Sequence, residues 1–173
     1  MKKELFLILH DIRSAYNVGA IFRTADGAGV GKIYLSGYTP CPHLLRKSVA
    51  GGPIPSNENK PYKTQADKMI EKTALGAEKS IPWEKCQDLK KLLEKLKEEK
   101  ISIVALEKND GATDIKKYKT KFPMALILGN EVEGVPEDIL QKCDAVVSIP
   151  MRGQKESLNV SVAAGIAMYE ILG

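Results

Sequence analysis

The stretch IPMRGQKESLNVSVAAGIAMYE, residues 149–170, runs from a short apolar segment through a polar loop into an apolar helix that nearly ends the chain. The start of this helix, which we expect over 158–171, carries Glu156, Ser157 and Asn159, more polar groups than a packing helix needs. A helix N-terminus offers free backbone N–H donors and the positive end of the dipole, which suit an oxygen-rich ligand or a reacting hydroxyl. Taken alone, the serine and the asparagine are better explained by helix capping.

Outward from this stretch, apolar runs alternate with amphipathic ones. Strands are expected at 5–10, 32–36, 80–86, 101–106, 125–128 and 145–149, and helices at 17–29, 64–75, 87–100, 136–142 and 158–171. Continuous apolar strands between helices predict an α/β fold, with a mostly parallel sheet and helices on both faces. Ligands of such sheets bind beyond the carboxyl ends of strands, so we expect the site in the loops after Leu106, Leu128 and Ile149. The connection 37–62 is long for a structureless loop and is expected to be functional or mobile.

Composition sets broad limits on the class of protein. The chain has 173 residues, of which 43% are hydrophobic, enough for one domain with a full core. No run of about 18 apolar residues is present, so no membrane span is expected. Cys41, Cys86 and Cys143 are far apart and odd in number, which is typical of neither a disulfide framework nor a zinc site and indicates a reducing cytoplasm. The net charge of +4 permits a polyanionic partner without requiring one.

A second informative segment, NVGAIFRTADGAG, covers residues 17–29. We interpret Asn17 as the N-cap of its helix. Arg23 is a charge within a small and apolar helix, and an unpaired buried charge costs several kcal/mol, so it needs a partner. That partner is either a carboxylate in a structural salt bridge or a phosphate or carboxylate ligand, to which the planar guanidinium is suited.

A third segment, LILGNEVEGVP, covers residues 126–136 and delivers Gly129, Asn130 and Glu131 from a strand into a loop. Gly129 permits a close backbone approach. The Glu131 carboxylate is placed either to hold a ribose hydroxyl or to pair with Arg23. The alternative interpretation is a tight turn that caps the next helix.

Several common sites have no support in this sequence. Neither GxGxxG after the first strand nor GxxxxGK[ST] is present, and no HExxH or clustered His and Cys indicates a metal. His10 closes a strand and is interpreted as structural rather than catalytic. No metal site and no Ser-His-Asp triad are therefore expected.

Together and in this order, the three segments resemble the motifs of the SpoU/TrmH family of RNA ribose 2′-O-methyltransferases in the SPOUT superfamily. The first motif is matched by Asn17, Arg23 and Thr24, and the second by Gly129, Glu131 and Gly134. The third is matched by Ile149, Pro150, Met151, Ser157, Leu158, Asn159, Val160, Ser161 and Ala163. The resemblance covers residues 5–171.

The resemblance implies a single domain over 1–173 with an α/β trefoil knot, a homodimer, and S-adenosylmethionine (AdoMet) as cofactor. Some relatives carry an additional RNA-binding domain, and none is expected within this sequence. The implied cofactor-binding residues are Leu106, Glu107, Gly129, Asn130, Glu131, Ile149, Met151 and Leu158. The implied catalytic residues are Arg23, Asn17, Glu131, Ser157 and Asn159, with Arg23 positioning an RNA phosphate and stabilising the developing alkoxide. Basic residues near predicted loops are expected to bind tRNA or rRNA: Arg13, Arg23, Arg46, Lys47, Lys60, Lys63, Arg152 and Lys155.

Three other functions stay open at this point. The first is a methyltransferase of the same fold that acts on a base, although the Ser-Leu-Asn-Val-Ser string at 157–161 favours ribose. The second is a non-enzymatic RNA-binding module, which loss of Arg23, Glu131 or Asn159 would favour. The third is a dinucleotide-dependent oxidoreductase, which the missing glycine fingerprint disfavours.

Overall fold

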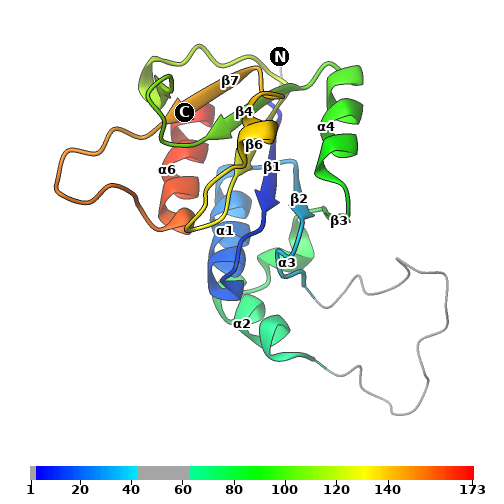
Figure 1. The fold of residues 1–173 in the computed structure, drawn as a ribbon. Helices are drawn as coiled ribbons and strands as arrows, with labels where there is room; N and C mark the ends of the chain where they lie inside the picture. The colour runs from blue at the N-terminus through cyan, green and yellow to red at the C-terminus, as the bar shows by residue number, and fades with distance from the viewer. Residues whose placement is uncertain (1–2, 43–62) are drawn as a thin grey trace.

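Strands and helices alternate along the chain in the computed structural model, which describes residues 3–42 and 63–173 (Figure 1). The strands are β1 (Leu5–His10), β2 (Lys32–Ser36), β3 (Trp83–Cys86), β4 (Ser102–Leu106), β5 (Thr113–Asp114), β6 (Met124–Leu128) and β7 (Ala145–Ser148). The helices are α1 (Ala15–Ala28), α2 (Gln65–Ala74), α3 (Ala77–Ser80), α4 (Leu89–Glu98), α5 (Glu137–Leu140) and α6 (Val160–Leu172), with the 3-10 turn η2 (Ile115–Lys117). Within these residues no helix is long and apolar enough to cross a membrane.

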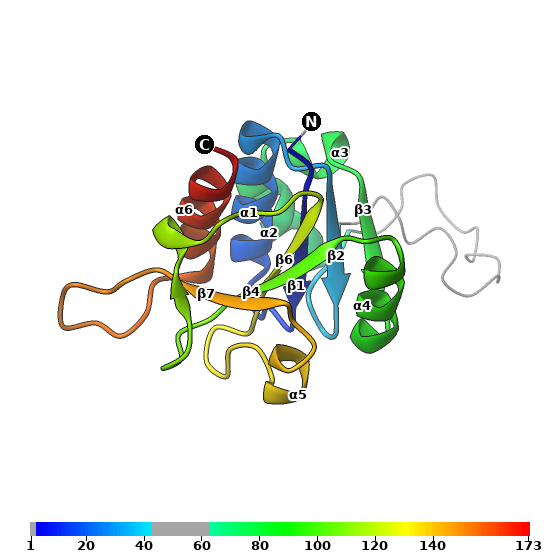
Figure 2. The same ribbon diagram turned by 90° about the horizontal axis from the view of Figure 1, so that it is seen from above.

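The described strands form one seven-stranded sheet in the order β3-β2-β1-β6-β4-β7-β5. Every pairing in it is parallel. Parallel neighbours need crossover connections, and the helices supply them on both faces of the sheet (Figure 2). The predicted α/β class with a covered parallel sheet is therefore confirmed.

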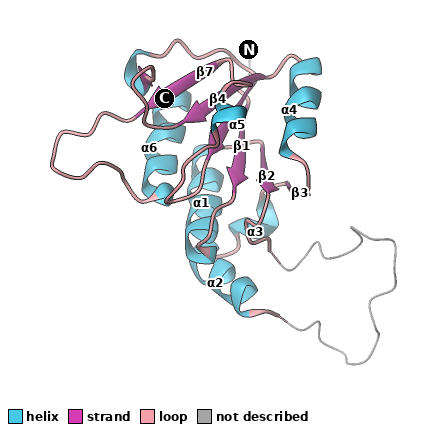
Figure 3. Cartoon of the chain, viewed as in Figure 1, coloured by secondary structure: helices cyan, strands magenta, loops and turns pink. Residues whose placement is uncertain are grey.

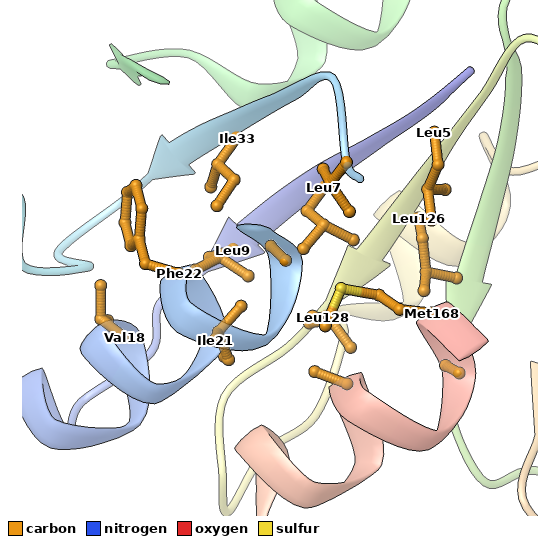
Figure 4. Close-up of a cluster of buried hydrophobic side chains, with 14 of the residues drawn as sticks. Leu5, Leu7, Leu9, Val18, Ile21, Phe22, Ile33, Leu126, Leu128 and Met168 are labelled. Atoms are coloured by element: carbon orange, nitrogen blue, oxygen red, sulfur yellow. The ribbon is translucent and has the colours of Figure 1, made fainter. Parts of the chain in front are cut away.

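One face of the sheet is covered by α1 and α6, and α2 packs on the outer side of α1 (Figure 2). Leu7 and Leu9 of β1 and Leu126 of β6 point toward Phe22 of α1 and Met168 of α6, and all five are fully buried (Figure 4). Burying each such side chain contributes about 1.5–3 kcal/mol. Alternation along the strands sends their other side chains to the opposite face.

That opposite face is covered by α4 and α5. Leu92, Leu93 and Leu96 share the inner face of α4 and pack in one cluster with Ile103 and Ile127 of the sheet. Lysines and glutamates occupy the outer face of α4, as the 3.6-residue period of the sequence predicts.

Close contact between α1 and α2 depends on one glycine. A Cβ at Gly19 would overlap the backbone carbonyl of Ile70 in α2. Because only glycine fits at this crossing, α2 packs directly on α1, which lies between the sheet and α2 and exposes Tyr16, Arg23 and residues 26–27.

The structure corrects the expected starts of several elements and adds one strand. The expected strand 80–86 begins only at Trp83, because Ser80 ends the short helix α3. The terminal helix begins at Val160 with Asn159 as its N-cap, so Glu156 and Ser157 lie in the preceding loop. The N-cap of α1 is Ser14 rather than Asn17, since the Ser14 side chain accepts the Asn17 N–H. The two-residue strand β5 has no counterpart in the prediction.

Candidate functional site

A cleft of about 340 Å³ lies at the carboxyl ends of β4, β6 and β7. These ends continue into loops that Figure 3 draws in pink. The cleft is lined by every residue predicted to bind the cofactor: Leu106, Glu107, Gly129, Asn130, Glu131, Ile149, Met151 and Leu158. It is also lined by Ser157 and by residues that the sequence did not single out as cofactor contacts: Lys108, Leu128, Val132, Gly134, Ser148, Glu156, Val160 and Ala163.

The loop after β6, residues 129–135, folds back on itself. The backbones of Asn130 and Gly134 exchange two hydrogen bonds, at 3.1 and 3.0 Å. A Cβ at Gly129 would overlap the backbone of Gly134, and Gly134 itself has φ of 71°. Both positions therefore require glycine, one for close approach and one for its left-handed conformation.

The side chain of Asn130 holds this loop from inside. Asn130 is only 8% exposed. Its Oδ1 accepts the N–H groups of Val132 and Glu133 at 2.7 and 2.9 Å, and its Nδ2 donates to the Asp11 carbonyl at 2.9 Å and to the Tyr38 hydroxyl. Because both ends of the amide are used, the Asn130 side chain shapes the loop and is not free to bind a ligand.

Glu107 ties the end of β4 to the same loop. Its carboxylate accepts the N–H of Lys108 at 2.9 Å and the N–H of Val135 at 2.8 Å. The Glu107 carboxylate thus accepts hydrogen bonds from two backbone N–H groups, and these bonds fix the end of β4 relative to the 129–135 loop.

The Glu131 carboxylate binds the start of α1 and not Arg23, which corrects one of the expected pairings. It accepts the N–H of Arg13 at 2.9 Å, the N–H of Ser14 at 3.2 Å and the Asn17 side-chain amide at 2.9 Å. Partial burial alone would raise the pKa of Glu131, but these donated hydrogen bonds outweigh it and lower the pKa from its ordinary value of 4.5. Glu131 is therefore ionised at neutral pH and anchors the first motif to the second.

Asn159 anchors the third motif to the first. Its Nδ2 donates to Asn17 Oδ1 at 3.1 Å, while its Oδ1 accepts the Ser161 N–H at 2.9 Å and so caps α6. The Asn17 amide consequently bridges Glu131 and Asn159, and one chain of hydrogen bonds joins all three segments that the sequence singled out.

Other residues predicted for the site are not drawn together. Arg23 is exposed on α1 and does not line the cleft, and it makes no hydrogen bond or ion pair with residues 3–42 or 63–173. Its expected structural salt bridge is therefore absent from this part of the chain. Among the residues predicted to bind RNA, Arg13, Lys63, Arg152 and Lys155 are exposed, while Arg46, Lys47 and Lys60 lie outside the described residues.

Sequence reasoning missed Asp11, Ser14 and Tyr38. Ser14 stands three residues before Asn17, and a serine before an apolar periodic run is an N-cap signal that could have identified it. Asp11 and Tyr38 carry no local signal, because their contacts with the 129–135 loop join residues 119 and 92 positions apart in the sequence. His10 donates to or accepts from Ser36 at 2.8 Å, in keeping with a structural role.

A model of the SpoU rRNA Methylase family matches residues 56–169. The chain is also similar to the 23S rRNA (guanosine-2'-O-)-methyltransferase RlmB of Salmonella typhi, at 33% identity over 170 residues, which make up 97% of this chain and 59% of that protein. This chain spans 59% of the length of the first curated relatives that it matches.

Solved structures share the fold. The A. aeolicus TrmH/SpoU tRNA modifying enzyme is similar with a TM-score of 0.76 and 26% identity, over 99% of this chain and 75% of that one. The SpoU methyltransferase AviRb from Streptomyces viridochromogenes, in complex with the cofactor AdoMet, has a TM-score of 0.78 and 22% identity, over 99% of this chain and 60% of that one.

Proposed function

This chain belongs to the SpoU rRNA methylase family, and from that premise we propose that it transfers a methyl group from AdoMet to a ribose 2′-hydroxyl of tRNA or rRNA. The observation that carries the proposal is the joining of three distant segments around one cleft, through Glu131, Asn17 and Asn159. Family membership further implies that the C-terminal segment threads through an earlier loop as a trefoil knot.

The lining of the cleft fits AdoMet. Leu106, Ile149 and Leu158 offer apolar surface, and the backbone of 129–135 approaches closely because Gly129 has no side chain. Such a mixture of apolar walls and few fixed polar groups is usual for cofactor sites of this size. When bound, AdoMet supplies a methyl group on a sulfonium, which is the electrophile of the reaction.

Residues of this chain would then position the RNA. A ribose hydroxyl is a weak nucleophile, and holding it in line with the methyl group supplies much of the rate acceleration. We assign orientation of the ribose to Ser157, with Asn159 and Glu131 holding the motif loops around it. We assign to Arg23 the positioning of a phosphate and the stabilisation of the developing alkoxide, because its guanidinium is exposed and has no described partner.

The position of Arg23 supports a homodimer. Arg23 lies outside the cleft of its own chain, on helix α1, which packs beside α6 (Figures 1 and 2). The same two helices expose apolar side chains: Tyr16 at 43%, Val162 at 50%, Ile166 at 37% and Tyr169 at 58%. Pairing of two copies through this surface would cover these side chains and bring one copy's Arg23 toward its partner's cleft.

The three free cysteines agree with action in the cytoplasm.

The first test is methyl transfer from labelled AdoMet to total tRNA and, separately, to rRNA that lacks the modification, followed by nucleoside mass spectrometry. The expected product is a 2′-O-methylated nucleoside. Arg23→Ala is expected to lower turnover by about 100-fold or more without changing the melting temperature. Lys97→Ala, an exposed residue on α4 at the opposite face of the sheet, is the matched control and should retain activity.

Each other product would identify another function. A methylated base would indicate a base methyltransferase of the same fold. Binding of RNA without binding of AdoMet would indicate a non-enzymatic RNA-binding module. Near-normal turnover by Arg23→Ala would contradict the role assigned to the arginine.

A dimer that shares its sites has a direct test. Mixing the Arg23→Ala chain with the Ser157→Ala chain should restore activity, because a mixed dimer contains one intact combination of the two residues. No recovery in a sample that sedimentation shows to contain mixed dimers would contradict a shared site.

A further inference from the structure

The turn after β2 presents an exposed aromatic side chain beside the cleft. Tyr38 is 57% exposed, yet its hydroxyl group accepts a hydrogen bond from the buried amide of Asn130, which lines the cleft. The ring is therefore anchored at its polar end and open to solvent over most of its surface. Burial in the core does not account for an aromatic residue at this position.

The turn that carries Tyr38 is held on both sides. The Tyr38 N–H donates to Asp11 Oδ1 at 2.9 Å, and Lys85 Nζ donates to the carbonyls of Gly37 and Thr39 at 2.6 and 2.8 Å. Gly37 has φ of 60°, and a Cβ there would overlap the Asp11 carboxylate. Thr39 is 1% exposed and donates to the Leu9 carbonyl. A ligand that contacts Tyr38 therefore meets a backbone that is already ordered, and little conformational entropy remains to be lost.

Positive charge lies near the ring. The Lys85 ammonium sits within the turn, and Arg13, two residues beyond Asp11, is exposed at the same edge of the sheet. The nearby Asp11 carboxylate is occupied by the Tyr38 N–H and lies 3.5 Å from His10 Nε2. An exposed aromatic ring with cations in the neighbouring segments suits unpaired nucleotides, since bases stack on the ring and the cations attract the phosphates.

We propose that Tyr38 is a stacking platform for an unpaired RNA base that flanks the nucleotide whose ribose enters the cleft. The inference rests on the proposed function, because the identity of the nucleotide in the cleft depends on it. It adds that the substrate is single-stranded or locally unpaired at the target, since a base within a duplex has no free face for Tyr38.

The test measures RNA binding directly by fluorescence anisotropy, with a short labelled single-stranded RNA and a duplex of the same sequence. The proteins compared are the wild type, Tyr38→Ala, Tyr38→Phe and Leu75→Ala, the last removing an exposed apolar side chain at the end of α2. Tyr38→Ala is expected to weaken single-strand binding by about 5- to 100-fold, the usual effect of losing one stacked base. Tyr38→Phe and Leu75→Ala should bind like the wild type, and duplex binding should be unchanged throughout.

Other outcomes separate this inference from the proposed function. If Tyr38→Phe and Tyr38→Ala lose RNA binding and AdoMet binding equally, Tyr38 acts by holding Asn130 and the platform is wrong. If all variants bind RNA equally while the wild type methylates it, the platform is wrong and the methyltransferase stands. If RNA binding follows the ring but no methyl group is transferred, the platform stands and the enzymatic function is wrong. A wild type that binds no RNA overturns both.

Discussion

Two loops of the cleft differ in how their shapes are determined. In 129–135, backbone and side-chain hydrogen bonds converge on Asn130 and Gly134. Residues 150–158 are almost entirely exposed, and no side chain among them hydrogen-bonds to another described residue. Both loops carry family motifs, but only the first is preorganised by its own chain. Binding must therefore order the second loop at a cost in conformational entropy, whereas the first loop has met that cost on folding.

The largest expected difference between the loops comes from adding one methyl group to each. Gly129→Ala forces a Cβ into the backbone of Gly134 and is expected to destabilise the fold by about 3 kcal/mol and to abolish AdoMet binding. Gly153→Ala meets nothing within 4 Å and should leave the fold unchanged. Urea unfolding and calorimetric titration with AdoMet measure both effects. Equal free energies of unfolding for Gly129→Ala and Gly153→Ala would contradict the proposed difference between the two loops.

Removing a polar side chain from each loop should give a smaller difference. Asn130→Ala leaves the N–H groups of Val132 and Glu133 without their acceptor and is expected to cost about 2 kcal/mol. Ser157→Ala removes a hydroxyl that is exposed, so the free energy of unfolding should stay within about 0.5 kcal/mol of the wild type. A Ser157→Ala loss as large as that of Asn130→Ala would show that the second loop is also held internally.

Neutralising one carboxylate sharpens the comparison within the first loop. Glu131→Gln replaces an acceptor of three hydrogen bonds by an amide and is expected to cost about 1 kcal/mol, a value moderated by partial exposure to solvent. Glu133→Gln, at an exposed neighbouring side chain, is the matched control and should have no measurable effect. Chemical unfolding at neutral pH distinguishes them.

The same carboxylate gives a dependence on pH. Because folding lowers the pKa of Glu131 below 4.5, its contribution to stability is complete above about pH 4.5 and is lost as the pH falls through the folded-state pKa. The difference in unfolding free energy between the wild type and Glu131→Gln should therefore be constant near neutral pH and shrink in acid. A difference that grows in acid would have the wrong sign for a lowered pKa.

The smallest effect is one on dynamics alone. In amide hydrogen exchange, residues 150–158 should exchange fast without ligand and slow down with AdoMet, whereas 129–135 should be protected in both conditions. Protection of 150–158 without AdoMet would remove the distinction between the loops.

The sequence predicted the parts of the fold that local periodicity determines. Leu89, Leu92, Leu93 and Leu96 define the inner face of α4 in the sequence as in the structure. The strand β5 was missed because its two residues, Thr113 and Asp114, pair only with β7 and have no apolar run of their own. The start of β3 was misplaced because the short helix α3 precedes it, and four residues carry too little period to reveal a helix.

Within the site, the sequence predicted many of the residues that line the cleft, but Arg23 lies outside it and the hydrogen-bond partners of the site residues were not predicted. Glu131 and Arg23 are complementary charges, so their pairing was a reasonable expectation. The sheet order instead places β6 directly beside β1, and the carboxylate therefore reaches the backbone N–H groups that open α1. Tyr38 was overlooked for the same reason, since only the folded sheet brings the end of β2 to the loop after β6.

The order of the strands also has a consequence for synthesis on the ribosome. β1 is an interior strand of the sheet, and one of its neighbours, β6, pairs Leu5 with Met124. The first strand to be made must therefore wait for most of the chain before its second edge is covered. Pairings of such long range slow folding, and an uncovered strand edge promotes aggregation. β1, α1 and β2 can associate early, while the cleft, whose walls follow β4, β6 and β7, is completed last.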